Sequence, residues 1–126
     1  MSTTPAAALD ELAAALTSVT GLRLAQLGAD FEPPGVVVGV PRLEWSGYHG
    51  YGNDTTPPSA ASFPIFLVAN LDPDKTVSEL LRYGPLVGAA IEKVTRATVE
   101  AADPGFYTAG GRDLPAYVFT AEFPLS

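Results

Sequence analysis

The sequence lacks cysteine and has few basic residues, and each absence excludes a class of function. None of the 126 residues is a cysteine, which excludes a disulfide framework, a thiolate metal site and a cysteine nucleophile. Seven lysines and arginines stand against 14 aspartates and glutamates, giving a formal net charge of -7. A protein that holds nucleic acid by its phosphates needs a basic surface. Because the seven basic residues are scattered along the chain, we expect no direct nucleic-acid binding.

Long apolar runs are also missing. The longest extend for only a few residues, around Val36 and Ile65, whereas a membrane-spanning helix needs about 20. The N-terminal segment has no basic stretch, and Asp10 and Glu11 interrupt its apolar residues, which is unlike a secretory signal. We therefore expect no membrane insertion and a protein that is used in the cytoplasm of the cell that makes it.

The residues that are abundant predict one packed domain over residues 1–126. Hydrophobic residues make up 47% of the chain, and 12 glycines with 12 prolines indicate frequent turns and short elements. Apolar residues at spacings of three and four predict a helix over residues 6–20, with Thr4 as its cap, Pro5 at its start and Gly21 at its end. The residues expected to face the core are Leu9, Leu12, Leu16 and Val19.

A second helical region is expected to be interrupted in its middle. The segment DPDKTVSELLRYGPLVGAAIEKV has capping-box spacing between Thr76 and Glu79. Gly84 and Pro85 should end one helix and open another. The residues of the two segments expected to face inward are Val77, Leu80, Leu81, Leu86, Ala90, Ile91 and Val94.

Strands are expected on both sides of this helical region. Residues 21–28 and 36–40 are strand candidates, and the second should continue to residue 45 with Pro41 at an edge or bulge. Strand 63–71 is apolar on both faces and should lie centrally, covered on both sides. The turn GGRDLP leads to a final alternating strand at 116–123. The order predicts an α+β fold, a mostly antiparallel β-sheet with an N-terminal helix and a broken middle helix packed on it.

The long loop at residues 46–62 is the candidate functional segment. Its first part, SGYHGYGND, holds the only histidine of the chain, and loops of this length are usually functional or disordered. His49 would suit acid–base chemistry, but no nucleophile motif accompanies it, and an exposed loop histidine is the favoured explanation. We expect Trp45 to lie in the core. The residues expected at a protein interface are Tyr48, His49, Tyr51 and Asp54, since tyrosine is enriched there.

The glycines of this loop do not form a nucleotide site. A dinucleotide fingerprint lies between a strand and a helix, whereas GYHGYG is followed by Asn-Asp-Thr-Thr-Pro-Pro and a strand. One histidine without cysteine leaves only carboxylates as further metal ligands. We therefore expect no catalytic residue, no cofactor and no metal.

Seven segments in a fixed order carry a family resemblance. They are GLRL, PPGVVVGVPRLEW, GYHGYGNDTT, FPIFLVANL, DKTVSELLRYG, GPLVGAAIEKV and TAGGRDLPAYVFTAEFPL. In order and spacing they resemble the tail terminator proteins of long-tailed phages of actinobacteria, which are also called tail completion or minor tail proteins. The resemblance covers nearly the whole chain, and it lies in the arrangement of the segments rather than in any one motif.

The resemblance implies a structural protein and not an enzyme. Tail terminators form a ring, typically a hexamer, at the head-proximal end of the tail tube. The ring stops polymerisation of the major tail tube protein and docks to head–tail connector or stopper proteins, while DNA passes through the lumen without specific binding. The resemblance would place this chain in the virion, at the neck between head and tail, after its synthesis in the host cytoplasm. Arg42, Arg82 and Arg112 are then candidate partners for acidic neighbours in the ring, and solvated surface arginines explain them equally well.

Two other functions stay open on the sequence alone. Another neck component, a head completion or stopper protein, has a similar size and class of fold. A small ligand-binding or hydrolytic α+β domain would instead use His49 and Tyr51, and would need a concave pocket with a second titratable group.

Overall fold

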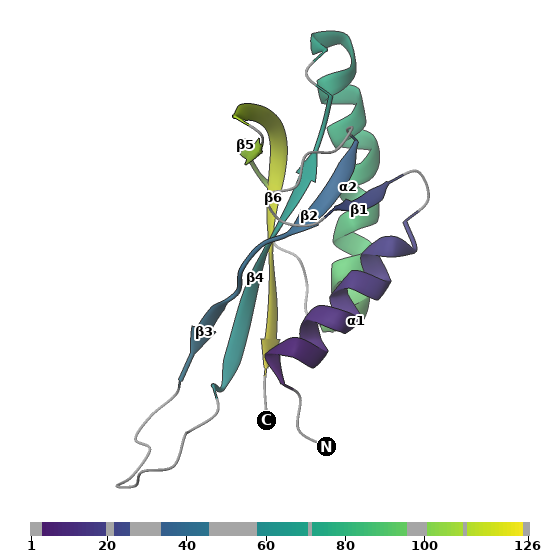
Figure 1. The fold of residues 1–126 in the computed structure, drawn as a ribbon. Helices are drawn as coiled ribbons and strands as arrows, with labels where there is room; N and C mark the ends of the chain where they lie inside the picture. Colours follow the sequence, from purple (N-terminus) through teal and green to yellow (C-terminus); the bar gives the residue numbers. More distant parts are fainter. Residues whose placement is uncertain are drawn as a thin grey trace, which may run out of the picture.

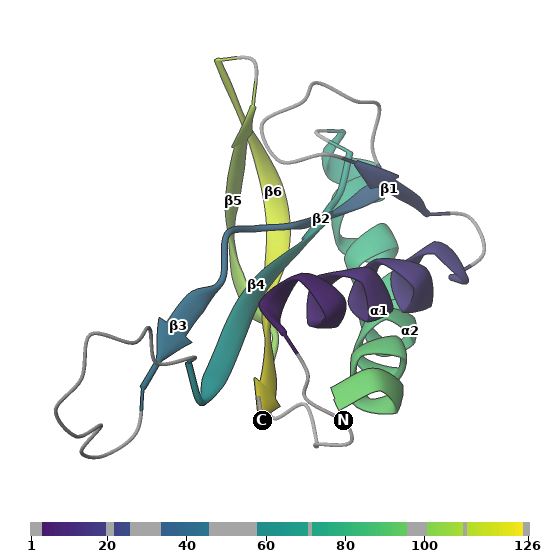
Figure 2. The same cartoon turned by 60° about the horizontal axis from the view of Figure 1, so that its bottom comes forward.

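Two helices pack on one face of a six-stranded, mostly antiparallel sheet, which confirms the α+β class (Figures 1 and 2). The computed structural model describes residues 4–19, 22–25, 34–45, 58–70, 72–95, 101–109 and 111–124. Its elements are α1 (Pro5–Thr17), β1 (Arg23–Ala25), β2 (Gly35–Val38), β3 (Arg42–Glu44), β4 (Ala60–Val68), α2 (Pro73–Thr95), β5 (Asp103–Ala109) and β6 (Arg112–Pro124). The strands adjoin in the order β1-β2-β4-β6-β5, and β3 also pairs with β4. Only β1 and β2 run parallel among these pairs.

Helix α1 begins where it was predicted to begin, but it ends before the predicted end at residue 20. The hydroxyl oxygen of Thr4 accepts a hydrogen bond from the backbone N–H of Ala7 at 3.1 Å, so the expected N-cap is confirmed. The helix ends at Thr17, before the predicted stop at Gly21. Ser18 is the C-cap residue, and its backbone N–H donates to carbonyl groups of the preceding turn.

The face of α1 that meets the sheet follows a spacing of four residues. Ala8, Leu12 and Leu16 are fully buried, and Val19 is buried as well. The prediction that Leu9 faces the core is wrong, because that side chain is exposed. Residues four apart lie above one another on a helix, so Ala8 rather than Leu9 continues the row of Leu12 and Leu16.

Helix α2 is continuous, so the predicted break at Gly84 and Pro85 is wrong. A proline inside a helix removes one backbone hydrogen bond and crowds the preceding turn. Pro85 is exposed, whereas Tyr83 and Val87 on either side of it are buried in the main core cluster. Packing of both halves on the sheet therefore outweighs the local cost of the proline.

Continuity of α2 also changes which of its residues face inward. The residues buried or half-buried as predicted are Leu80, Ala90, Ile91 and Val94. Val77, Leu81 and Leu86 are exposed, contrary to the prediction. In one unbroken helix, Tyr83 and Val87 occupy the inward positions instead.

The start of α2 is tied to the end of β4. The backbone N–H of Asn70 donates to Oε1 of Glu79 at 2.9 Å, and the hydroxyl of Thr76 donates to the carbonyl of Asn70. The backbone N–H of Asp74 donates to Oδ1 of Asp72 at 3.1 Å. Thr76 and Glu79 therefore connect two elements and do not form the predicted capping box.

Strand β4 is central, as predicted, but helices cover only one of its faces. Ala61, Phe63, Ile65 and Leu67 point into the main core, and the residues between them are half-buried. Because both helices lie on that face, the prediction that both faces are covered is wrong for most of the strand. A second, smaller cluster covers the opposite face near the end of β4, and its buried members are Val37, Val68, Tyr107, Leu114 and Ala116.

A bulge separates β2 from β3. The two strands pair with β4 in registers that differ by one residue, so residues 39–41 stand opposite two residues of β4. The backbone N–H of Gly39 donates to the carbonyl of Pro64 at 2.7 Å, and Pro64 has no N–H with which to return the bond. The irregularity predicted at Pro41 is confirmed, and the proline on the neighbouring strand explains it.

The predicted C-terminal hairpin is confirmed. Ala109 pairs with Arg112, so two residues connect β5 to β6. The second of them, Gly111, has a φ of 77°, a conformation that glycine adopts without strain and that tight hairpins require. Strand β6 already begins at Arg112, before the predicted start at residue 116.

Candidate protein interface

The four candidate residues of the glycine-rich loop, Tyr48, His49, Tyr51 and Asp54, lie outside the described residues. The flanking strands bring the two ends of this loop together. The backbone N–H of Ser59 donates to the carbonyl of Glu44 at 2.7 Å, and β4 follows directly. The loop therefore closes before residue 62, where the prediction placed its end.

Strand β3 and the first residues of β4 form a hairpin that extends away from the two helices (Figures 1 and 2). Residues 40–45 expose three large apolar side chains, those of Val40, Leu43 and Trp45. Trp45 is 48% exposed, so the expectation that it lies in the core is wrong. We call residues 40–45 the β3 arm.

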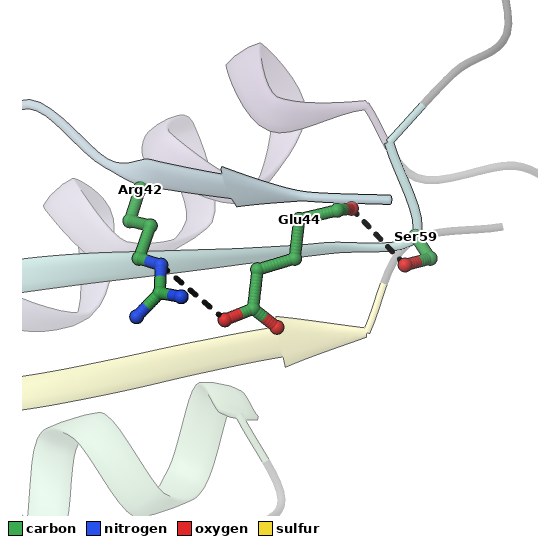
Figure 3. A network of polar contacts seen from close by, with 3 residues as sticks. All are labelled: Arg42, Glu44 and Ser59. Atoms are coloured by element: carbon green, nitrogen blue, oxygen red, sulfur yellow. Dashed lines mark hydrogen bonds and ion pairs between the residues drawn. The ribbon is translucent and has the colours of Figure 1, made fainter. Parts of the chain in front are cut away.

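The β3 arm also carries a cation. Arg42 and Glu44 are two residues apart on one strand and therefore share a face of the sheet. Nε of Arg42 lies 3.5 Å from Oε1 of Glu44, and both side chains are well exposed (Figure 3). The hydroxyl of Ser59 donates to the carbonyl of Glu44 at 3.0 Å. The hydrogen bonds of Ser59 hold the outer end of the arm, at Glu44, against the residues that lead into β4. The exposed ion pair adds little stability.

The three predicted arginines lie on three different elements. Arg82 is exposed on α2, and its guanidinium carbon is 5.2 Å from the ring centre of Tyr83, a distance typical of a cation–π contact. Arg112 is the first residue of β6, and its side chain lies outside the described part of the structure. Strand β3, which carries Arg42, lies away from α2 in both views (Figures 1 and 2). The structure therefore does not unite them in one site.

An open groove of about 430 Å³ lies between α2 and β6. Gly84 and Gly88 form part of its lining and bring no side chain that could fill it. A Cβ at these positions would lie 3.6 Å from Tyr117 and 3.7 Å from Phe119, respectively. We call this the α2 groove. Besides the two glycines, its lining includes Leu81, Pro85, Ala89, Glu92, Tyr117 and Phe119.

The α2 groove was not predicted from the sequence. Its walls come from segments that are far apart in the chain, 84–88 and 117–119. The available signal was the pair Gly84 and Gly88, because residues four apart in a helix share a face. The predicted break at residue 84 assigned the two glycines to different helical segments, so their common face was not recognised.

The chemistry of these surfaces suits binding of another protein. Glu92 is the one charged residue among those that line the α2 groove, and the rest of the lining is mostly apolar, as at protein interfaces. No three His, Cys, Asp or Glu side chains of the described residues come together as metal ligands. Neither helix in this part of the chain is long and apolar enough to cross a membrane. No protein-family model and no curated protein matches the sequence.

Proposed function

We propose that this protein is a phage tail terminator, a subunit of a ring at the head-proximal end of the tail tube. The observation that supports this best is the presence of two separate apolar surfaces, the β3 arm and the α2 groove, on one small domain. Exposed apolar surface of this kind is typical of proteins that become buried in assemblies. The resemblance of the ordered segments to tail terminators suggests the kind of assembly.

In this role the two ends of the ring bind different partners. One end binds the tube as a further ring of the major tail tube protein would. The other end does not accept a tube ring and instead docks to the head–tail connector or stopper protein. Six copies carry a formal charge of 6 × -7 = -42, and an acidic lumen repels DNA phosphates, so that DNA passes without being held.

Electron microscopy of lysates tests this function, using the encoding phage with this gene deleted. We expect over-long tail tubes and tails that do not join filled heads, because nothing ends tube growth. A plasmid copy of the gene should restore normal joined virions. Normal tail length with unjoined heads would instead identify another neck component, and normal virions without the gene would exclude both functions.

A further inference from the structure

We infer that the β3 arms of two copies of this protein pair edge to edge, as antiparallel strands around a twofold axis at Leu43. The contact joins two free copies into a dimer, and it does not rest on the proposed function. Three features of the arm carry it, namely an edge without a neighbour, the order of charges along the strand and the exposed apolar side chains.

One edge of β3 has no neighbour among the described strands. Strand β3 pairs with β4 along one edge, and no other strand of the described residues pairs with it. Both views place β3 at the end of the sheet that extends away from the helices (Figures 1 and 2). Such an edge presents backbone N–H and C=O groups that can pair with a further strand.

The backbone groups at this edge are those of Leu43. The carbonyl of Glu44 faces β4, because it accepts a hydrogen bond from the backbone N–H of Ser59 at 2.7 Å. Successive residues of a strand direct their backbone groups to opposite edges. The N–H and C=O of Leu43 therefore point away from β4, and two copies of Leu43 placed opposite each other exchange two hydrogen bonds.

The order of charges along β3 fits a second copy of the same strand. Two antiparallel strands centred on Leu43 place Arg42 of each copy opposite Glu44 of the other, and opposite charges across a strand pair are favourable. Within one copy, Nε of Arg42 already lies 3.5 Å from Oε1 of Glu44 on the same face, and the side chains are 79% and 43% exposed (Figure 3). The dimer therefore keeps the ion pair of each copy and joins the two pairs into one network of alternating charges.

The same charges disfavour the neighbouring registers. A shift by two residues in one direction places the two copies of Arg42 opposite each other, and a shift in the other direction does the same for Glu44. Like charges directly opposite destabilise a pair of strands. A shift by one residue places Leu43 of one copy on the charged face of the other. The pairing centred on Leu43 is therefore the one that the sequence of β3 favours.

The other face of the paired arms is apolar. Leu43 is 38% exposed, and Trp45, two residues further along, is 48% exposed. Residues two apart in an extended chain share a face, so the two copies of Leu43 meet at the axis with the two copies of Trp45 beside them. Burial of these side chains and the backbone hydrogen bonds supply affinity, whereas the charges select the partner and the register.

This dimer differs from the proposed ring. A twofold dimer uses the same surface on both copies, whereas a cyclic ring joins two different surfaces of neighbouring subunits. The arms of two copies therefore separate when a ring forms. The dimer covers the arm in the free protein, where an exposed strand edge is otherwise a site for unwanted pairing.

Exchange of the charges on the arm tests the pairing by sedimentation velocity. Arg42→Glu leaves an arm with two acids, and Glu44→Arg leaves an arm with two bases. Each variant alone should dimerise about tenfold more weakly than the native chain, because like charges then lie opposite each other on both sides of the axis. An equimolar mixture of the two variants should form a heterodimer as readily as the native chain dimerises, because every cross-strand pair again joins opposite charges.

The controls change the net charge by the same amounts without changing the arm. Arg23→Glu on β1 and Glu11→Arg on α1 replace exposed residues. They give net charges of -7 - 2 = -9 and -7 + 2 = -5, as the two arm variants do. Neither control should lose dimer to the extent of the arm variants, and mixing the two controls should give no recovery. Circular dichroism checks that each variant is folded.

A disulfide locates the axis, because the chain has no native cysteine. Residues that exchange hydrogen bonds across an antiparallel pair have Cα atoms about 5.5 Å apart, which suits a disulfide. Under a mild oxidant, Leu43→Cys should form a covalent homodimer at least about tenfold faster than Leu24→Cys, because the dimer raises the local thiol concentration. Leu24 lies on β1 and is 37% exposed, which makes it a matched control.

Three results would overturn the inference. A native chain that stays monomeric would show that the arm is left for a strand of a different protein. A mixture of the arm variants that forms no heterodimer would exclude the pairing of Arg42 with Glu44 between copies. Equal rates of disulfide formation at Leu43→Cys and Leu24→Cys would exclude the axis at Leu43.

These results are separable from those on the proposed function. A dimer with the inferred register together with normal virions in the deletion phage would keep the contact and exclude the terminator. Over-long tubes in the deletion phage together with a monomeric native chain would keep the terminator and overturn the contact.

Discussion

Gly39 lies at the bulge between β2 and β3, where the backbone comes closest to the neighbouring strand. A Cβ at this position would lie 2.8 Å from Cγ of Pro64 and 3.3 Å from Cε2 of Phe66. The ring of Pro64 is part of the β4 backbone and has little freedom to move. The glycine is therefore required by the close approach of the two strands at the bulge, where the register with β4 changes between β2 and β3.

Substitution of this glycine should destabilise the fold. We expect Gly39→Ala to lower the free energy of unfolding by about 1–3 kcal/mol, since the added methyl overpacks a buried site. Urea denaturation followed by circular dichroism measures the change. An unchanged unfolding midpoint would show that β3 can shift to accommodate the methyl group.

Gly88 differs from Gly39 because there is room for a side chain. A Cβ would meet Cε1 of Phe119 at 3.7 Å, an ordinary contact distance, and glycine inside a helix costs about 1 kcal/mol relative to alanine. We expect Gly88→Ala to raise the free energy of unfolding by up to about 1 kcal/mol in the same assay. A loss of stability would mean that the floor of the α2 groove is already fully packed.

At the scale of the elements, Pro85 is the residue that interrupts the backbone hydrogen bonding of α2. It lacks the N–H that would bond to the carbonyl four residues earlier, and its ring is exposed, so no packing depends on it. We expect Pro85→Ala to stabilise the protein by about 1–3 kcal/mol in urea denaturation. Pro104→Ala is the control, because Pro104 lies on β5, at the edge of the described sheet, and alanine there should have little effect. Equal effects of both substitutions would contradict the view that the missing helical hydrogen bond at Pro85 is what costs stability.

Local signals predicted the elements that depend on local chemistry. The cap at Thr4 and the glycine turn before Arg112 are short-range features, and both are confirmed. The continuity of α2 was not predictable in this way, because burial of Tyr83 and Val87 on the sheet outweighs the preference of Pro85 to break a helix.

The candidate site was predictable only where its residues are close in the chain. Arg42, a predicted interface residue, lies on the β3 arm. The α2 groove was not predictable from the sequence, because its lining joins Gly84 and Gly88 of α2 to Tyr117 and Phe119 of β6, which are far apart in the chain. Trp45 was wrongly predicted to lie in the core, because an aromatic residue beside a strand does not indicate that the strand extends away from the core.

At the scale of the whole molecule, net charge opposes the assembly that the apolar surfaces favour. Every copy carries -7, and the proposed ring of six copies would bring 6 × -7 = -42 together. This repulsion acts over distances comparable to the Debye length, about 10 Å at 0.1 M salt, and is screened as the salt concentration rises. Burial of apolar side chains does not depend on such screening.

We therefore expect self-association to become stronger, not weaker, between about 20 mM and about 300 mM sodium chloride. Sedimentation velocity at a fixed protein concentration measures the fraction of oligomer at each salt concentration. The control variant combines Asp10→Asn with Glu11→Gln, two exposed acids of α1, and changes the charge of each copy from -7 to -7 + 2 = -5. The variant should form more oligomer than the native chain at low salt, because its copies repel one another less. At high salt, where the repulsion is screened in both proteins, the two oligomer fractions should become similar. Association that falls with salt in both proteins would mean that ion pairs, rather than the apolar arm and groove, hold the copies together.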